Sequence, residues 1–331
     1  MNARVLLPGA VALGITLVAT VRAQGTALDR RVSAVADGAV ELHFAARADA
    51  CGDGIHWYRI GDDAWFGSFN GSDDGDARTV CAEGPVRVRL ALASREIVRI
   101  STYVGPLQRG EDATDLGEVP AAEASTWLLS LAGRLDGRPA RDAVLPAVLA
   151  REGAPVAALQ GVARNEDRSH DTRRAALSAL PRAAGSAGVT SVVAFAAQAT
   201  DPWLAREALR LIARSGDPRA RAQLRTVAQD AKADESLRLI AISGVGNEFA
   251  TAADGALLRG IYRTMETERA RGAVLNAVAN VGGKASAEWL LTVARNGDES
   301  PALRRNAVQA LERIDSPEAI NGLISLALPR P

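Results

Sequence analysis

The chain has few of the residues that usually build metal and redox sites. Its 331 residues include only two cysteines, three histidines and two methionines. So few Cys and His residues leave little material for a zinc site, and two methionines exclude a methionine-lined binding face. Neither sign of charge prevails, since 39 Lys and Arg residues balance 39 Asp and Glu residues. This balance removes the global electrostatic argument for nucleic-acid binding. We therefore expect no nucleic-acid partner, no metal and no cofactor.

Motifs of the common catalytic and nucleotide-binding folds are also missing. The sequence has no Gly-x-Ser-x-Gly elbow, no His-Glu-x-x-His and no Gly-x-x-x-x-Gly-Lys. Gly244-Val245-Gly246 is shorter than a dinucleotide fingerprint and follows a helical pattern, so we interpret it as a helix end. His43 and His56 stand in strand-like segments, where two histidines are more often structural than part of a site. His170 lies in a polar turn that we expect to be solvated. We predict no catalytic residue.

Residues 1–23 have the pattern of an export signal. Arg4 precedes a mostly apolar run from Val5 to Val21, and Val21-Arg22-Ala23 is a small-x-small cleavage site. We predict cleavage before Gln24 and a mature chain that is periplasmic or secreted. The alternative is an uncleaved membrane anchor, but this run is broken by proline and glycine and falls short of the roughly twenty apolar residues that a spanning helix needs. No second long apolar run follows, so we expect no membrane span in the mature chain.

Residues 24–120 have the pattern of a small β domain. Alternating apolar and polar residues predict strands at 40–44, 55–60, 86–92 and 97–103, with Val98, Ile100 and Thr102 on one face of the last strand. Clusters of Gly, Asn and Asp separate these segments, as turns require. Cys51 and Cys81 are the only cysteines. Because an exported chain meets an oxidising compartment, we predict that they form a structural disulfide rather than a redox pair.

An acidic segment from Asn70 to Asp76 raises the hypothesis of a calcium loop. The helix–loop–helix calcium motif needs a glutamate at its twelfth position. Counted from Asn70, that position holds Cys81. We therefore interpret the segment as a solvated hairpin loop.

Residues 121–331 repeat one pattern at nearly constant intervals. An Arg-x-Ala motif followed by an apolar residue recurs five times, and its arginines are Arg141, Arg174, Arg206, Arg271 and Arg305. Leu239-Ile240-Ala241-Ile242 fills the missing slot, so the six anchor alanines are Ala143, Ala176, Ala208, Ala241, Ala273 and Ala307. Their spacings are 33, 32, 33, 32 and 34 residues. Periods of this length predict stacked pairs of helices, and small anchor side chains let neighbouring pairs approach closely.

The arginine column admits two interpretations. A basic stripe on equivalent helical positions would bind an acidic ligand. A structural ladder would instead pair each arginine with an Asp or Glu from its own or the next turn. Asp201 and Asp298 lie near Arg206 and Arg305 in the sequence, and arginine is well suited to buried and interface ion pairs. The ladder is therefore the favoured interpretation.

These repeats resemble the short bacterial form of the HEAT-like repeat family, over about two-thirds of the chain. The likeness rests on the Arg-x-Ala motifs and on the apolar helices before them, such as 127–132 and 289–294. It implies a right-handed α-solenoid of about six two-helix HEAT-like repeats at 121–331. The predicted fold class is therefore a small disulfide-linked β domain followed by this all-α region. The β segment is in turn similar to the leading domain of some exported HEAT-repeat proteins, through Cys51-Gly52-Asp53-Gly54 and Tyr103-Val104-Gly105.

The resemblance also implies a role in binding other macromolecules. We expect an exported, non-enzymatic scaffold that binds a protein or peptide partner on the solenoid surface, and such a scaffold predicts a broad groove with mixed polar side chains. The first alternative is an enzyme with a site at the junction of β domain and solenoid, which predicts a compact pocket with converging carboxylates or histidines and displaced pKa values. A bilin-lyase-like activity, known in some relatives, is least favoured and predicts a chromophore-sized apolar cavity.

Overall fold

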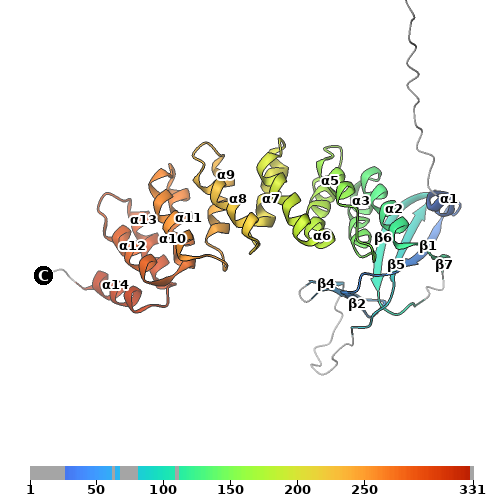
Figure 1. The fold of residues 1–331 in the computed structure, drawn as a ribbon, viewed down its shortest axis with the longest axis horizontal. Coiled ribbons are helices and arrows are strands. Elements are labelled where there is room, and N and C mark those ends of the chain that lie inside the picture. Colours follow the sequence, from blue (N-terminus) through green and yellow to red (C-terminus); the bar gives the residue numbers. More distant parts are fainter. Residues whose placement is uncertain (1–26, 62–63, 68–80, 109–111, 329–331) are drawn as a thin grey trace, which may run out of the picture.

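The protein has a β domain at one end and a long array of helices that follows it in chain order (Figure 1). The structure is a computed structural model, and it describes residues 27–61, 64–67, 81–108 and 112–328. The predicted export signal at 1–23 and the acidic segment at 70–76 lie outside the described residues. None of the helices in the described ranges is both long enough and apolar enough to cross a membrane.

The described residues of the β domain form one helix and two sheets. The helix is α1 (Ala27–Ser33). The larger sheet has the order β6-β5-β1-β7, built from β1 (Gly38–Phe44), β5 (Val86–Ala93), β6 (Glu96–Val104) and β7 (Ala113–Glu118). The smaller, antiparallel sheet consists of β2 (Ala50–Gly52), β3 (Trp57–Ile60) and β4 (Ala64–Gly67). The four predicted strands correspond to β1, β3, β5 and β6, whereas nothing in the sequence pattern indicated α1 or β7, which pairs in parallel with β1.

The face of the larger sheet that packs on the core is apolar, as the alternation in the sequence predicts. Val40, Leu42 and Phe44 of β1 have no exposed surface. The prediction that Val98 shares a face with Ile100 and Thr102 is wrong, because Val98 is 52% exposed. The pairing of β5 with β6 shifts register there, leaving Val98 without a partner residue. Such a bulge resets the alternation of side chains along a strand.

Cys51 and Cys81 form the predicted disulfide, with their Cα atoms 5.2 Å apart. The bond ties β2 to the segment before β5, across 30 residues of sequence. In the chain-entropy model, closing a loop of this length stabilises the folded state by about 3.5 kcal/mol. A small domain with two short sheets gains much of its stability in this way.

The helices α2 to α14 pack in two layers along the array. The first layer contains α2 (Ala121–Arg134), α5 (Val156–Arg164), the second half of α6 (His170–Gln198), α8 (Pro218–Gln229), α10 (Ala252–Ile261), α12 (Gly283–Arg295) and α14 (Pro317–Ala327). The second layer contains α3 (Gly137–Asp142), α4 (Val144–Val148), the first half of α6, α7 (Pro202–Ile212), α9 (Glu235–Val245), α11 (Glu268–Val281) and α13 (Pro301–Glu312). The 3-10 turn η1 (Tyr262–Thr264) follows α10.

The helix α6 serves both layers because its backbone breaks in the middle. Ala184 and Gly185 leave the helical conformation, and Gly185 has a φ of +50°. A positive φ favours glycine, which has no Cβ to clash with the backbone. The two halves therefore act as successive helices of the array, and the repeating pattern continues through them.

Polar residues begin most helices of the array. The side chain of Asp201 accepts a hydrogen bond from the backbone N–H of Trp203 at 2.9 Å, and Pro202 fills the first helical position. The side chains of Ser300, before α13, and of Asp234, before α9, likewise accept hydrogen bonds from backbone N–H groups of the first turn. At the other end of α9, Gly246 follows the last helical residue, as expected for a helix end. These caps satisfy backbone amides that a helix leaves without partners.

The six anchor alanines all lie in the second layer, where successive helices meet. Five of them have no exposed surface, namely Ala143, Ala176, Ala208, Ala241 and Ala307. Ala273 is half-buried, because Gly272 and Val274 take the fully buried positions of α11. Ala143 lies between α3 and α4 and keeps a right-handed helical backbone. The packing leaves little space: a Cβ on Gly246 would lie 2.7 Å from the Cα of Ala277 in the next repeat.

The β domain and the first helices share one hydrophobic core. The indole Nε1 of Trp127 donates a hydrogen bond to Asp29 at 2.8 Å, and Arg134 forms an ion pair with the same carboxylate. The backbone of Ala46 pairs with that of Ala150 as an isolated antiparallel bridge. The β domain therefore covers the first end of the helical array.

A buried carboxylate connects two first-layer helices near the middle of the array. Asp254 has no exposed surface, and its oxygens accept hydrogen bonds at 2.7 Å from Arg221 and from Arg225 of α8. Asp254 also closes a capping box with Thr251 at the start of α10. Burial by itself raises the pKa of Asp254, but the hydrogen bonds from Arg225 and Thr251 outweigh it and hold that pKa far below its usual value.

Replacing Ala241 by leucine tests the close packing of the repeats. Ala241 has no exposed surface, so the larger side chain overpacks the helix contact and lowers the free energy of unfolding by about 1–3 kcal/mol. Urea denaturation followed by circular dichroism measures the change. Ala273→Leu, at a half-buried anchor, is the matched control and has the smaller effect. Equal effects at both positions would contradict the role assigned to burial.

Replacing Asp254 by asparagine tests the buried ion cluster. A carboxyl group whose folded pKa is depressed stabilises the fold above its unfolded pKa of about 4 and loses that contribution as the pH falls further. At neutral pH the variant is therefore less stable by about 3 kcal/mol, because it leaves two arginines without their partner. Below pH 4 the gap narrows as the wild type is protonated. Glu248→Gln, at an exposed carboxyl, is the control, and parallel pH curves for wild type and Asp254→Asn refute the assignment.

Candidate functional site

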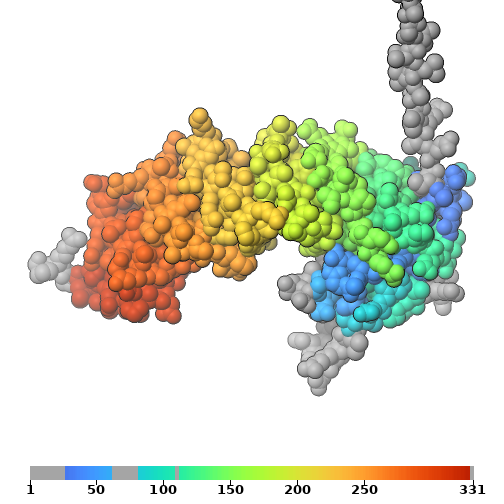
Figure 2. Space-filling model, in the orientation of Figure 1, coloured from blue at the N-terminus to red at the C-terminus, as the bar shows by residue number. Residues whose placement is uncertain are grey.

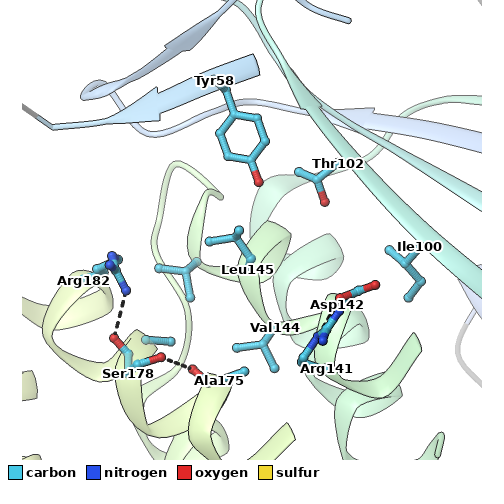
Figure 3. Close-up of a pocket in the computed structure, with 12 residues that line it drawn as sticks. Tyr58, Ile100, Thr102, Arg141, Asp142, Val144, Leu145, Ala175, Ser178 and Arg182 are labelled. Atoms are coloured by element: carbon cyan, nitrogen blue, oxygen red, sulfur yellow. Dashed lines mark hydrogen bonds and ion pairs between the residues drawn. The ribbon is translucent and has the colours of Figure 1, made fainter. Parts of the chain in front are cut away.

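A cavity of about 380 Å³ lies where the β domain meets the second layer of the array (Figure 3). We call it the junction pocket. Its apolar wall comes from α4 and α6, through Val144, Leu145, Val148, Ala175 and Ala179, and from Ile100 of β6. The pocket exists because α3 packs beside β6 while α6 stands one repeat further along. Neither the β domain nor the array forms it alone.

Polar groups lie at the edge of the junction pocket. Tyr58 of β3 is 7% exposed, and its hydroxyl points into the cavity, near Thr102 (Figure 3). Burial, together with the negative charge of Asp142, raises the pKa of Tyr58 well above its usual value. At neutral pH the phenol therefore keeps its proton.

The charged side chains of the pocket are already engaged. Asp142 accepts hydrogen bonds from Arg141 at 2.8 and 2.9 Å and from Arg138 at 3.3 Å. Arg182 donates to the carbonyl oxygen of Ser178 at 3.2 Å, and the Ser178 hydroxyl donates to that of Ala175 at 3.0 Å. Within the set of described residues that line the pocket, Asp142 is the one carboxylate and no histidine is present. The lining suits the burial of an apolar group beside polar side chains.

Three members of the arginine column form ion pairs. Arg141 binds Asp142, as described above, and Arg174 binds Glu207 of the next repeat at 3.1 Å. Arg271 lies 3.5 Å from Glu299, also one repeat further along. Arg174 and Arg271 each link neighbouring repeats, whereas Arg141 pairs with the next residue in the sequence. These three arginines therefore do not form a continuous basic stripe that is free to bind an acidic ligand.

The prediction that Arg206 pairs with Asp201 is wrong, because Asp201 forms its ion pair with Arg173 instead. Arg173 is 3% exposed and stands in the first turn of α6. From there its guanidinium reaches the carboxylate of Asp201, which caps α7. Arg305 is exposed on α13, and among the ion pairs between described residues none joins it to Asp298. Proximity in the sequence therefore did not predict the ion pairs of Arg206 and Arg305 correctly.

Two buried arginines outside the predicted column donate hydrogen bonds to carbonyl groups at the ends of the preceding helices. Arg173 Nε donates to the carbonyl oxygen of Ala163 at 3.0 Å, and Arg238 Nη2 donates to that of Ala228 at 3.4 Å. Both bonds reach ten residues back, to the last turn of the helix before, where a cation is favoured. Arg173, and not Arg174, therefore matches Arg238. The sequence hides the role of Arg173 because residues 173 and 174 are both arginine. The Arg-x-Ala motif selects Arg174, which stands one position after the buried arginine.

The three histidines do not come together. His43 lies in β1, whereas His56 precedes β3 in the other sheet, with its Nδ1 3.3 Å from an Asp53 oxygen. His170 is exposed, as expected, and stacks on Trp203 with ring centroids 4.2 Å apart. Within the part of the chain that the structure describes, no three His, Cys, Asp or Glu side chains are grouped to hold a metal ion.

Residues 255–330 match the family model for HEAT repeats. The match supports a HEAT-like repeat protein, in agreement with the resemblance seen in the sequence. Human deoxyhypusine hydroxylase in complex with glycerol is a similar solved structure, with 15% identity over 61% of this chain and 82% of that chain and a TM-score of 0.30. A lipovitellin structure on lipid–protein interactions has 12% identity over 82% of this chain and 33% of that chain, with a TM-score of 0.43. No curated protein matches the chain.

The ionisation of Tyr58 tests the electrostatics of the junction pocket. Because its pKa is raised in the folded protein, Tyr58 ionises later than a free tyrosine, for which the pKa is about 10. In a spectrophotometric titration to alkaline pH, Tyr58→Phe removes one late-ionising phenol. Asp142→Asn keeps the phenol but lowers its pKa, since the nearby negative charge is gone. An unchanged titration curve in both variants would show that Tyr58 does not lie in this environment.

Proposed function

We propose that the protein is an exported, non-enzymatic scaffold that binds a protein or peptide partner on its helical array. In this proposal residues 1–23 direct export and are removed, and the mature chain is periplasmic or secreted. The array is a right-handed α-solenoid of about six two-helix HEAT-like repeats. Solenoids of this kind typically use an extended concave surface for binding.

The observation that carries the proposal is the chemistry of the junction pocket. Its wall is apolar, its phenol is protonated, and its carboxylate is bound by Arg138 and Arg141. An apolar side chain of a partner fits such a site, with Tyr58 as a hydrogen-bond donor at the edge. An acid–base mechanism would instead need a free carboxylate or histidine that faces the reacting group.

The surface next to the pocket favours a long ligand. The array arches between the β domain and the C-terminal helices and leaves an open hollow beneath it (Figure 2). Along the second layer, Arg174 and Arg210 both pair with Glu207. Side chains of both signs therefore lie on this layer, and a scaffold is expected to bind its partner through a mixed surface of this kind. We infer that a partner inserts one apolar side chain into the junction pocket and continues along this layer.

The alternative function is an enzyme with its site at the same junction. The compact shape of the pocket and the Tyr58–Asp142 interaction favour this candidate. A volume of about 380 Å³ lies near the lower end of the range for small-ligand sites, about 300–1,000 Å³. A bilin-lyase-like activity needs room for a whole tetrapyrrole and remains the least favoured candidate.

Filling the pocket tests the scaffold function. Ala175 lines the cavity, and Ala175→Trp places an indole in the space assigned to the partner's side chain. The tagged wild type is expected to retain a partner from the exported fraction of the producing cells, and the variant is expected to lose at least tenfold in apparent affinity, or about 1.4 kcal/mol. Ala222→Trp, at an exposed position of α8 in the other layer, is the matched control.

Two outcomes would contradict this function. If Ala175→Trp retains the partner as well as the control does, the junction pocket is not part of the binding surface. If the wild type converts a small molecule and Tyr58→Phe abolishes that turnover, the enzyme is the better description. Circular dichroism of each variant shows whether the fold is intact.

A further inference from the structure

Another cavity, of about 560 Å³, lies between the 3-10 turn η1 and the helix α12. We call it the aromatic pocket. The turn η1 and α12 form two of its sides, and the polar turn that follows α12 forms a third. It shares no lining residue with the junction pocket, and α12 stands toward the end of the array that is away from the β domain (Figure 1). Its lining residues are Tyr262, Arg263, Trp289, Thr292, Val293, Arg295, Asn296, Asp298 and Glu299.

Two aromatic rings form the apolar wall of the aromatic pocket. The ring of Trp289 meets that of Tyr262 at an angle of 85°, with 5.2 Å between the ring centroids. This edge-to-face contact is one of the preferred arrangements of aromatic pairs. Tyr262 is only 3% exposed, whereas Trp289 is half-buried and keeps part of its surface open. A flat apolar surface therefore lies beside the polar groups of the pocket.

Two buried oxygen atoms at this pocket make no hydrogen bond of good geometry. They are the hydroxyl of Tyr262 and Oε2 of Glu299. Among the described residues, the other buried side-chain atoms in this state are all Nε atoms of arginines. A buried polar atom without a good partner costs free energy, so native structures normally supply one. Because both residues line the same cavity, one bound group can satisfy both oxygens.

The protonation of Tyr262 decides which groups fit beside it. Burial, and then the negative charge of Glu299, raise the pKa of Tyr262 to about 12. At neutral pH the phenol therefore keeps its proton and is a donor, while an ionised carboxylate only accepts hydrogen bonds. A hydroxyl group matches this pair, because a single oxygen atom accepts one hydrogen bond and donates another.

The charges around the aromatic pocket do not favour an ionic ligand. Its lining has two arginines and two carboxylates, so the formal charges cancel. A cationic ligand would compete with Arg271, whose guanidinium lies 3.5 Å from Glu299 and 5.9 Å from the centre of the Tyr262 ring. The protein itself thus compensates the charge of Glu299. The pocket consequently suits a neutral ligand that has hydroxyl groups.

We propose that the aromatic pocket binds a neutral saccharide. A sugar ring has hydroxyl groups around a body of C–H groups, so one face of the ring packs on Trp289 while a hydroxyl bonds to Tyr262 and Glu299. The volume of about 560 Å³ lies within the range of small-ligand sites, about 300–1,000 Å³. The site does not rest on the proposed function, because binding at the junction pocket involves other residues.

An NMR titration of the tryptophan side chains tests the proposal. The chain has five tryptophans, and Trp289→Phe identifies the ¹⁵N-labelled indole signal of Trp289. The probes are glucose, galactose, mannose and N-acetylglucosamine at neutral pH. We expect at least one of them to shift this signal, with a dissociation constant on the order of 1 mM for a single ring. The proposal is overturned if none of the four sugars shifts it.

A tyrosine variant tests the assigned hydrogen bonds. Tyr262→Phe removes the hydroxyl alone and weakens binding of the sugar at least tenfold. Tyr103→Phe is the matched control, with the same chemical change in β6, and binds the sugar like the wild type. Equal affinities of the two variants contradict the proposal.

Thermal unfolding separates a ligand-binding role of the Tyr262 hydroxyl from a structural one. A buried hydroxyl without a good partner does not stabilise the fold, so without sugar Tyr262→Phe has a Tm equal to or above that of the wild type. Excess sugar raises the Tm of the wild type more than that of the variant. A loss of stability in Tyr262→Phe together with unchanged binding assigns the hydroxyl to the fold and overturns the proposal.

Charged counterparts of the bound sugar test the choice of a neutral ligand. The corresponding amino sugar and uronic acid keep most of the hydroxyl groups but add a positive or a negative charge. Both are expected to shift the Trp289 signal with at least threefold lower affinity than the neutral sugar. Tighter binding of either one contradicts a neutral ligand.

Discussion

The whole array depends on how closely successive helices approach each other. At Gly246 the backbone of the next repeat comes so near that a Cβ has no room, and at Ala241 the helix surface is fully buried with only a methyl group in place. Each repeat contacts only its neighbours, so stability is the sum of many such contacts. Small residues therefore set the distance between successive helices.

Arginine side chains complete these contacts in a second way. Arg173 and Arg238 reach back to the carbonyl groups that end the preceding helix, where the backbone has no partner of its own. Asp254, bound by arginines of α8, links two first-layer helices through buried charges. A charge pair in a repeat interface is directional, whereas apolar contacts are not. The buried arginines therefore specify the orientation of one repeat on the next as well as its distance.

The β domain covers the first helices of the array and forms one side of the junction pocket. Its helix α1 covers α2, and its strands β3 and β6 face α3 and α6 across the junction pocket. At the other end of the described array, Ile320 and Ile324 of α14 are exposed.

Much of this architecture follows from the sequence by itself. The near-constant spacing of alanines is sufficient to predict stacked helices, since helix pairs of that length cannot bury their apolar faces alone. The alternation in 40–44 and 86–92 predicts strands, and two cysteines in a chain with a predicted export signal predict a disulfide. Other features needed the tertiary structure. A bulge turned Val98 outward, because strand register depends on the partner strand. A one-residue difference between repeats decided that Arg173 is buried and Arg174 is not. The junction pocket joins Tyr58 to Ala175, which are far apart in the chain, and only the packing of one part on the other brings such residues together.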